Sequence, residues 1–403
     1  MYLIVDGCSE KIAGAVMFLA AVLISFFSWK FIYSDDLKSK KCKSKLIVLI
    51  DFVSAVSLSS IAIIEALMFG NKLYYASCFF IVYIFGTKYL FKYLVKNKPV
   101  DELSISIINF LCCFGILVLF RIKRYTGFAQ LENLFASLIC FAFCYYFTLK
   151  NFKSKEKLLA YFSYITVFLL VLPIVFGREI NGAKAWISLP GMSFQPSEFG
   201  KITSILSLVH MLKNKKIKSA LAFSVVCLLL LVLQKDLGTA LIYFSFSFVL
   251  IFYVHRDKKL MLLVVLLAIA GSFAAYYAFP HVQKRLRIWL NPWNDPNDEG
   301  YQIVKALEAM REGGLFGRGF GFGLAKKIPA HETDFIFSFI INEFGMLSGA
   351  FIVTLYATLA LRLYSIKKLA HDVSSRLILI AVMTSIFSQA FIIIAGNLKL
   401  IPL

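Results

Sequence analysis

The feature that most constrains this chain is its series of long apolar segments. Runs of roughly 15–25 apolar residues recur along it, the length that crosses the hydrocarbon core of a bilayer as an α-helix. Because of these runs, 60% of the residues are hydrophobic and only 16% are charged, whereas a soluble domain is nearer half apolar and a quarter charged. We therefore predict an all-α, polytopic membrane protein with about twelve transmembrane helices.

Basic residues give these spans an orientation. Lys and Arg gather in alternate loops, such as Lys38–Lys45 and Lys213–Lys218, and the positive-inside rule places such loops in the cytoplasm. The alternation predicts an external N-terminus and leaves Arg121, Lys123 and Arg124 outside, against the rule. It also accounts for the net charge of +20. We expect no nucleic-acid binding, because no basic patch accompanies a soluble recognition motif.

The expected spans fall into two parts. We predict an N-terminal extension of three transmembrane helices over residues 1–100 and a core over residues 101–403, with a large extracellular loop, 280–334, between the tenth and eleventh spans. The spans are Ala13–Trp29, Leu46–Phe69, Leu73–Leu90, Leu103–Phe120, Leu134–Phe147, Leu158–Phe176, a short span ending at Leu212, Ala220–Leu233, Leu237–Val254, Leu260–Phe279, Phe335–Leu361 and Leu377–Ala395.

The first polar segment of interest is external and ends at a predicted helix start. Pro196 and Ser197 are typical of the beginning of a helix, with Glu198 in its first turn. Glu198 and Lys201 are three residues apart, so they share one helix face just inside the membrane. They fit either an ion pair that anchors the helix end or an ionisable pair that lines a polar cavity. We favour the cavity, because charge at that depth needs a reason.

Two further polar segments follow. Gln234–Ala240 separates two spans, and Asp236 can cap the ninth helix. The long external loop combines a cluster around Asp295, a glycine-rich stretch and Asp334. Dense glycine suits backbone that bends tightly or approaches a ligand. Lys and Arg here could bind a pyrophosphate and a carboxylate could activate a hydroxyl. Equally, the Asp295 cluster fits turn formation, and Asp334 fits a carboxylate at a helix N-terminus.

Four stretches carry a family resemblance: FGREINGAKAWISLPGMSFQPSEFGKI, QKDLGTALI, NPWNDPNDEGYQIVKALEAMREGGLFGRGFGFG and ETDFIFSFIINEFG. In this order and spacing, from about Leu103 to the end, the chain resembles the SEDS family, whose members serve cell division, rod elongation and sporulation. The resemblance implies a helical peptidoglycan glycosyltransferase of the bacterial cytoplasmic membrane. It would polymerise lipid II at the outer face, with a class B penicillin-binding protein as its transpeptidase partner.

The resemblance also implies roles for individual residues. Asp334, in the T-D-F-I-F motif, would deprotonate the acceptor sugar hydroxyl, which attacks the anomeric carbon with inversion while undecaprenyl pyrophosphate leaves. Glu198 and Lys201 match the family's Q-P-S-E-x-x-K motif. Lys201 would face the leaving pyrophosphate or keep the aspartate ionised, and Glu198 would position polar groups. Further contacts to pyrophosphate or glycan are expected from Arg178, Lys184, Lys235 and Arg318.

The chain departs from the family pattern in three ways. Many members have His directly before the Thr-Asp pair, where this chain has Glu332, with His331 one place earlier. The N-terminal extension lies outside the common core; Asp51 and Glu65 within it indicate either function or a partner helix. The chain stops at Leu403, one core span short of the family, which suggests a truncated or degenerate protein.

Two other functions remain open. A flippase for lipid-linked precursors also needs a polar cavity, but it needs polar access from both leaflets, and the informative residues here crowd the outer face. A non-catalytic scaffold for a transpeptidase fits the early end of the chain, although the retained Asp334, Glu198 and Lys201 argue against it. No dedicated metal-ligand set is visible; Mg²⁺ at the pyrophosphate is chemically reasonable.

Overall fold

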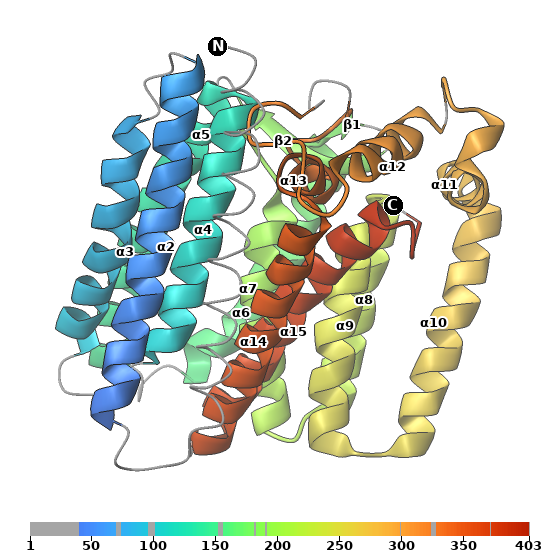
Figure 1. The fold of residues 1–403 in the computed structure, drawn as a ribbon. Helices are drawn as coiled ribbons and strands as arrows, with labels where there is room; N and C mark the ends of the chain where they lie inside the picture. The colour runs from blue at the N-terminus through green and yellow to red at the C-terminus, as the bar shows by residue number, and fades with distance from the viewer. Residues whose placement is uncertain are drawn as a thin grey trace. The chain divides into compact units, whose positions relative to one another are not determined.

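A computed structural model describes most of the chain and is predominantly helical (Figure 1). The described residues are 40–69, 74–95, 101–151, 156–180, 183–189, 192–298, 300–323, 328–370 and 372–402. The predicted span Ala13–Trp29 lies outside them. The chain divides into two compact units: unit 1 combines Met1–Phe147 with Pro292–Arg362, and unit 2 combines Thr148–Asn291 with Leu363–Leu403. Each unit is described by itself.

The elements are distributed between the units as follows. Unit 1 contains α2 (Lys40–Phe69), α3 (Tyr74–Val95), α4 (Glu102–Ile122), most of α5 (Arg124–Asn151), η3 (Pro292–Asn294), α12 (Tyr301–Gly313), α13 (Ile336–Phe344) and most of α14 (Met346–Leu369). Unit 2 contains α6 (Glu156–Phe176), β1 (Arg178–Ile180), β2 (Ala183–Leu189), β3 (Met192–Phe194), α7 (Pro196–Lys213), α8 (Ile217–Leu233), α9 (Leu237–His255), α10 (Lys258–Ala278), α11 (Pro280–Leu290) and α15 (Val373–Asn397).

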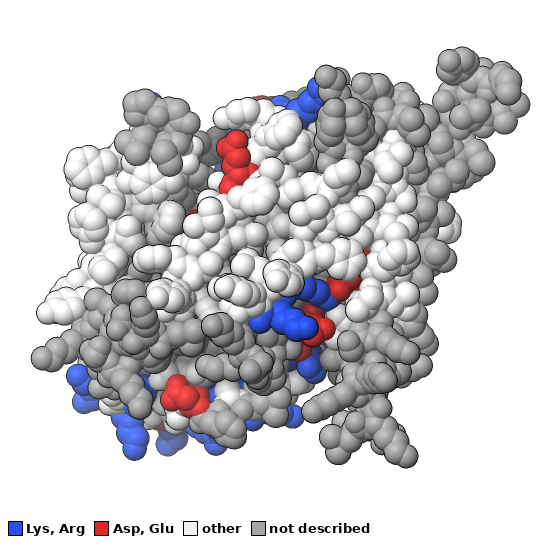
Figure 2. Space-filling view, turned by 90° about the vertical axis from the view of Figure 1, so that its left-hand side faces the viewer, with Lys and Arg blue, Asp and Glu red and all other residues white. Residues whose placement is uncertain are grey.

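Hydropathy and helix length confirm a polytopic membrane protein. Among the described residues, seven helices are long and apolar enough to cross a bilayer, and α8 and part of α2 are shorter apolar helices. Figure 2 shows that uncharged side chains cover most of the described surface on one face, with Lys and Arg mostly toward its lower edge. The seven candidate spans are Glu102–Ile122, Arg124–Phe143, Leu159–Phe176, Leu237–His255, Lys258–Ala278, Met346–Lys368 and Val373–Asn397.

The predicted eleventh span, Phe335–Leu361, is wrong as a continuous helix. The chain breaks at Gly345, whose φ is 88°, into the short α13 and the membrane-length α14. A Cβ at Gly345 would lie 2.2 Å from the carbonyl oxygen of Leu315, so only glycine allows this close approach. The apolar helix α13 is therefore not part of the membrane-length helix α14 and groups with the loop elements that precede it.

A small antiparallel sheet, in the order β1-β2-β3, is an exception to the all-α prediction. It occupies the segment between α6 and α7, which was predicted to be external, with Arg178 opposite Trp186 and Ile187 opposite Phe194. Two of its strands have three residues and the middle one has seven. Strands this short carry too little alternation to be recognised in the sequence.

Buried polar contacts join α2 and α3 of the extension to α4. Asp51 of α2 forms an ion pair with Lys88 of α3, and the Asn109 amide of α4 donates to the Thr87 hydroxyl at 2.7 Å. Interhelical hydrogen bonds of this kind are common between membrane helices. The charge of Asp51 is therefore matched by a neighbouring helix of the extension. The side chain of Glu65 lies outside the described residues.

Aspartate residues begin several helices by accepting hydrogen bonds from the first-turn amides, which helix ends otherwise leave without a partner. Asp236 accepts from the Thr239 amide at 3.1 Å, which confirms the predicted cap of α9. Asp101 starts α4 in the same way and is also held by the Arg362 guanidinium at 2.7 Å. This second contact ties α14 to the beginning of α4 within unit 1.

Candidate functional site

The beginning of α7 is fixed by a buried tyrosine of α9. Tyr243 is 1% exposed, and its hydroxyl donates to the Ser197 carbonyl at 2.9 Å. A Cβ at Gly200 would lie 2.7 Å from that hydroxyl, so glycine leaves the space that the tyrosine fills. Pro196 is the first residue of α7, as predicted. This packing determines where the first turn of α7 presents its charges.

Lys201 is a buried amine with two oxygen partners. The residue is 6% exposed, and its ammonium lies 2.7 Å from the Glu198 carboxylate and 3.2 Å from the side-chain oxygen of Gln389 on α15. The Glu198 side chain is 47% exposed. The shared face predicted for Glu198 and Lys201 is thus present, and one end of the pair reaches the surface. No motif or spacing in the sequence pointed to Gln389 as a partner of Lys201.

The polar segment before α9 is joined to the small sheet. The backbone amide of Lys184 in β2 donates to the Gln234 carbonyl at 2.9 Å, and the Gln195 amide donates to the Asp236 carboxylate at 2.8 Å. Gln234 is fully buried and its side chain donates to the Leu170 carbonyl at 2.5 Å. The segment is therefore an anchor for the sheet and for the start of α7 as well as a connection between two helices.

The predicted substrate-binding cations lie at exposed positions in both units. In unit 2, Arg178 and Lys184 lie on β1 and β2, and the Lys235 ammonium is 3.5 Å from the Glu179 carboxylate. In unit 1, the Arg318 guanidinium is 3.6 Å from Glu312. Exposed pairs of this length contribute little to folding, so these side chains can exchange their partners for an anionic ligand.

Asp334 is exposed in the turn that directly precedes α13. The backbone amides of Thr333 and Phe335 both donate to the Ala330 carbonyl at 3.1 Å, which gives this turn its shape. Glu332 forms an ion pair with Lys123, the C-cap residue of α4. Lys123, at the end of α4, therefore contacts the segment that carries Asp334.

The cluster around Asp295 forms turns, as one of the two interpretations predicted. The Asp295 side chain accepts from the Asp298 amide at 3.2 Å, and its carbonyl accepts from the Gly300 amide at 2.8 Å. Gly300 has no room for a side chain, because a Cβ would lie 2.1 Å from the Pro292 carbonyl. These residues lead the chain into α12.

Residues Gly317–Gly323, here called the glycine loop, wrap around the end of α13. Gly317, Gly319 and Gly321 have φ values of 85°, 99° and 97°, which side chains rarely allow. The amides of Arg318 and Gly319 donate to the Asn342 and Glu343 carbonyls at 2.9 and 3.1 Å. The close approach predicted from the glycine content is therefore made to α13 of the same chain.

Glu343, which the sequence analysis missed, is the carboxylate that the glycine loop covers. It is fully buried and lies on α13, outside the candidate membrane spans. Its carboxylate accepts from the Gly321 amide, and the Arg121 guanidinium of α4 donates to the Gly321 carbonyl. Burial raises the pKa of Glu343 to about 7, against the opposing effects of the Arg121 charge and the loop amides.

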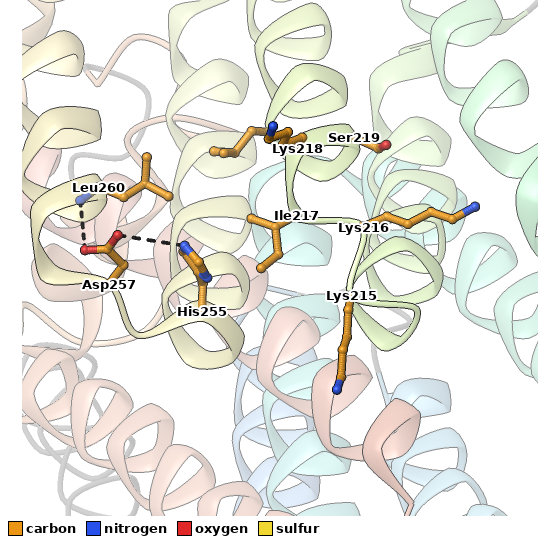
Figure 3. Close-up of a pocket in the computed structure, with 9 residues that line it drawn as sticks. Lys215, Lys216, Ile217, Lys218, Ser219, His255, Asp257 and Leu260 are labelled. Carbon is orange, nitrogen blue, oxygen red and sulfur yellow. Dashed lines mark hydrogen bonds and ion pairs between the residues drawn. The ribbon is translucent and has the colours of Figure 1, made fainter.

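A pocket of about 700 Å³ lies at the other end of α7 from Glu198. Its lining includes Lys215, Lys216 and Lys218, whose side chains point in different directions, and the His255–Asp257 pair (Figure 3). The helix of 18 residues separates the two ends by about 25 Å. This pocket contains none of the predicted site residues, and its lysines belong to a run that the positive-inside rule already explains.

The described part of the chain shows no group of side chains suited to hold a metal ion. There, no group of three or more His, Cys, Asp or Glu side chains is placed to hold an ion. We therefore derive no step from a protein-bound metal.

The fold and these charged segments define a multi-pass helical membrane protein with polar elements at the helix ends. Residues 102–403 match the family described as cell cycle proteins, which groups FtsW, RodA and SpoVE. The chain belongs to this family, as the motif order and spacing predicted.

Named relatives agree with this assignment. The chain is 32% identical over 281 residues to the peptidoglycan glycosyltransferase RodA of Mycobacterium tuberculosis strain H37Rv, covering 63% of this chain and 60% of that protein. It is 31% identical over 329 residues to the stage V sporulation protein E of Bacillus subtilis strain 168, covering 76% of this chain and 89% of that protein. The match thus spans about 60% of the length of the Mycobacterium tuberculosis protein.

Solved structures share the fold. A mutant of the Rod shape determining protein RodA of Thermus thermophilus matches with a TM-score of 0.55 at 23% identity, over 75% of this chain and 87% of that one. A chain from a peptidoglycan synthase complex that coordinates polymerization and crosslinking matches with a TM-score of 0.54 at 23% identity, over 80% and 88% of the two chains.

Proposed function

We propose that this protein is a peptidoglycan glycosyltransferase that polymerises lipid II at the outer face of the bacterial cytoplasmic membrane, for division, elongation or sporulation. The observation that carries the proposal is an exposed Asp334 within the family match over residues 102–403. The names of the mycobacterial and Bacillus relatives support it. In this topology the N-terminus is outside, and the lysine-rich connection from the end of α7 to the beginning of α8 faces the cytoplasm.

The proposed step is an inverting displacement. Asp334 accepts the proton of the acceptor sugar hydroxyl, the hydroxyl oxygen forms a bond to the anomeric carbon of the donor, and the bond from that carbon to the pyrophosphate oxygen breaks. Undecaprenyl pyrophosphate then leaves with the electron pair. An exposed carboxylate suits this role, because the hydroxyl of a sugar can reach it.

Lys201 is assigned to the negative charge of this reaction, either at the leaving pyrophosphate or as the cation that keeps Asp334 ionised. Its partners Glu198 and Gln389 hold the ammonium in place, so little reorganisation is needed as charge develops. Glu198 positions polar groups, and the exposed Arg178, Lys184, Lys235 and Arg318 supply contacts to pyrophosphate or glycan. Mg²⁺ would bind with the substrate pyrophosphate, which an assay in EDTA tests.

A class B penicillin-binding protein is the proposed partner, since such a transpeptidase would crosslink the strands that this chain makes. The fold likeness to a chain of a peptidoglycan synthase complex agrees with an assembly of this kind. Addition of the candidate transpeptidase to the polymerisation assay measures whether the partner raises the rate.

The deciding experiment measures glycan strands formed from lipid II by the purified protein, with and without the transpeptidase. We expect Asp334→Ala to lower the rate by about 10²–10⁴-fold, the usual contribution of a general base. Glu308→Gln is the matched control, because Glu308 is a partly exposed carboxylate of α12 paired with Lys305; its rate should equal the wild type. Polymer from Asp334→Ala at the wild-type rate would remove Asp334 from the mechanism. No polymer from folded wild type would direct the search to lipid II translocation or a scaffold role.

A further inference from the structure

Gly321 is held at both of its backbone polar groups by ionisable side chains from two different helices. Its carbonyl accepts from Arg121 of α4, 200 residues away in the sequence. Its amide donates to Glu343 of α13, 22 residues away. With a φ of 97°, Gly321 adopts a backbone conformation that depends on such contacts to be populated uniquely.

The same two helices control the segment that carries Asp334. The end of α4 holds the glycine loop through Arg121 and holds Glu332 through Lys123. Asp334 lies in the turn at the beginning of α13, and Glu343 lies near the end of that helix. A change at Glu343 can therefore reach Asp334 along one short rigid helix and through the shared end of α4.

The two protonation states of Glu343 fit the closed loop to different extents. Desolvation under the loop disfavours the ionised carboxylate more than the Arg121 charge and the loop amides stabilise it, so the covered site favours the protonated acid. Opening the loop would hydrate the carboxylate, so loss of the proton favours the open loop. Arg121 of α4 is the charged group that acts on Glu343, and Arg318 of the glycine loop is paired with Glu312 of α12. The ring of His331 is stacked against Phe339 of α13.

We propose that Glu343 and Arg121 form a proton-sensitive clamp on Gly321 that positions the glycine loop and the Asp334 segment for catalysis. Glu343 is a positioning residue, since it is buried under the loop and acts through Gly321. The clamp is closed when Glu343 carries its proton and loosens when the carboxylate ionises. This inference rests on the proposed function for its effect on rate, while the clamp itself can be measured without activity.

The first test is the pH profile of lipid II polymerisation from pH 6 to 8. With a pKa of about 7 for Glu343, the protonated fraction and the wild-type rate should fall about tenfold over this range. Glu343→Gln, which resembles the neutral acid, should be faster than wild type at pH 8 and nearly independent of pH. Arg121→Gln should shift the midpoint upward, because the Arg121 charge lowers this pKa. The Glu308→Gln control should keep the wild-type profile. A Glu343→Gln profile that superimposes on the wild type would overturn the proposal.

The second test measures hydrogen exchange of peptides that cover the glycine loop, corrected for the intrinsic pH dependence of exchange. Protection in the wild type should fall several-fold between pH 6 and 8, and Glu343→Gln should lack this fall. This result stands even if no variant polymerises lipid II, so failure of the proposed function and failure of the clamp are distinguishable. Equal protection in wild type and Glu343→Gln at both pH values contradicts the clamp. If Glu343→Gln does not fold, Arg121→Gln takes its place in the same comparison.

Discussion

The segments that carry Lys201 and Asp334 are held in different ways. In unit 2, Lys201 is buried in α7, the start of which is fixed by Tyr243, and its ammonium is held by Glu198 and Gln389. In unit 1, Asp334 is exposed in a turn that depends on ion pairs and a glycine loop. Tight packing fixes Lys201, whereas adjustable charge contacts fix the segment of Asp334, the proposed base.

This difference indicates which of the two segments can change its order when the pH changes. A close-packed core has few alternative arrangements, so the Lys201 segment should resist changes of pH. Exposed and loop-bound contacts open at lower cost, so the Asp334 segment should be the part whose order varies. Three predictions test that contrast.

The largest expected effect is on activity when the buried cation is removed. Lys201→Met should lower the polymerisation rate by about 10²–10³-fold, the usual loss for one preorganised charge-stabilising group. Stability should change by less than about 1 kcal/mol, because Glu198 is close to half exposed and can be hydrated once it loses its partner. Rate assays and unfolding curves on the same preparation check both parts. A strongly destabilised Lys201→Met with normal specific activity would make Lys201 a structural residue.

The next effect is on stability as a function of pH. The folded pKa of Glu343 is raised from 4.5 to about 7, so the contribution is fully present below pH 4.5 and is lost as pH rises through 7. The free energy of unfolding should therefore fall by about 3 kcal/mol over this range, and the rate of polymerisation should fall as the clamp loosens. Glu343→Gln should remove this component of the pH dependence. Denaturant titrations at several pH values measure it, and an identical pH dependence in wild type and variant would place the titration elsewhere.

The smallest effect tests how Tyr243 fixes the beginning of α7. Gly200→Ala should destabilise the protein by about 1–3 kcal/mol through overpacking, since its Cβ would lie 2.7 Å from the Tyr243 hydroxyl. Tyr243→Phe removes that oxygen and its bond to Ser197 and should cost about 1 kcal/mol. The double variant should be more stable than the sum predicts, with a coupling near 1 kcal/mol. Strict additivity in unfolding measurements would show that the tyrosine does not limit the space at Gly200.

Local patterns were enough to predict much of the fold. The apolar runs of α4, α6, α9, α10 and α15 predicted membrane helices because span length and hydropathy are properties of consecutive residues. The same holds for the Pro196 helix start, the Asp236 cap and the shared face of Glu198 and Lys201, which depend on spacings of one to four residues. The motif order predicted the family.

Only the tertiary structure decided how these segments are held. Gln389 reaches Lys201 across 188 residues and Arg121 reaches Gly321 across 200, distances over which no periodicity or capping pattern carries information. The break at Gly345 was hidden because α13 and α14 form one apolar run, and the glycine is required by the backbone packed against it. In the sequence, Glu343 is a single acidic residue within that apolar run, and nothing in the local pattern marks it as special. Its burial beneath the glycine loop, which raises its pKa to about 7, exists only once α4, the loop and α13 meet.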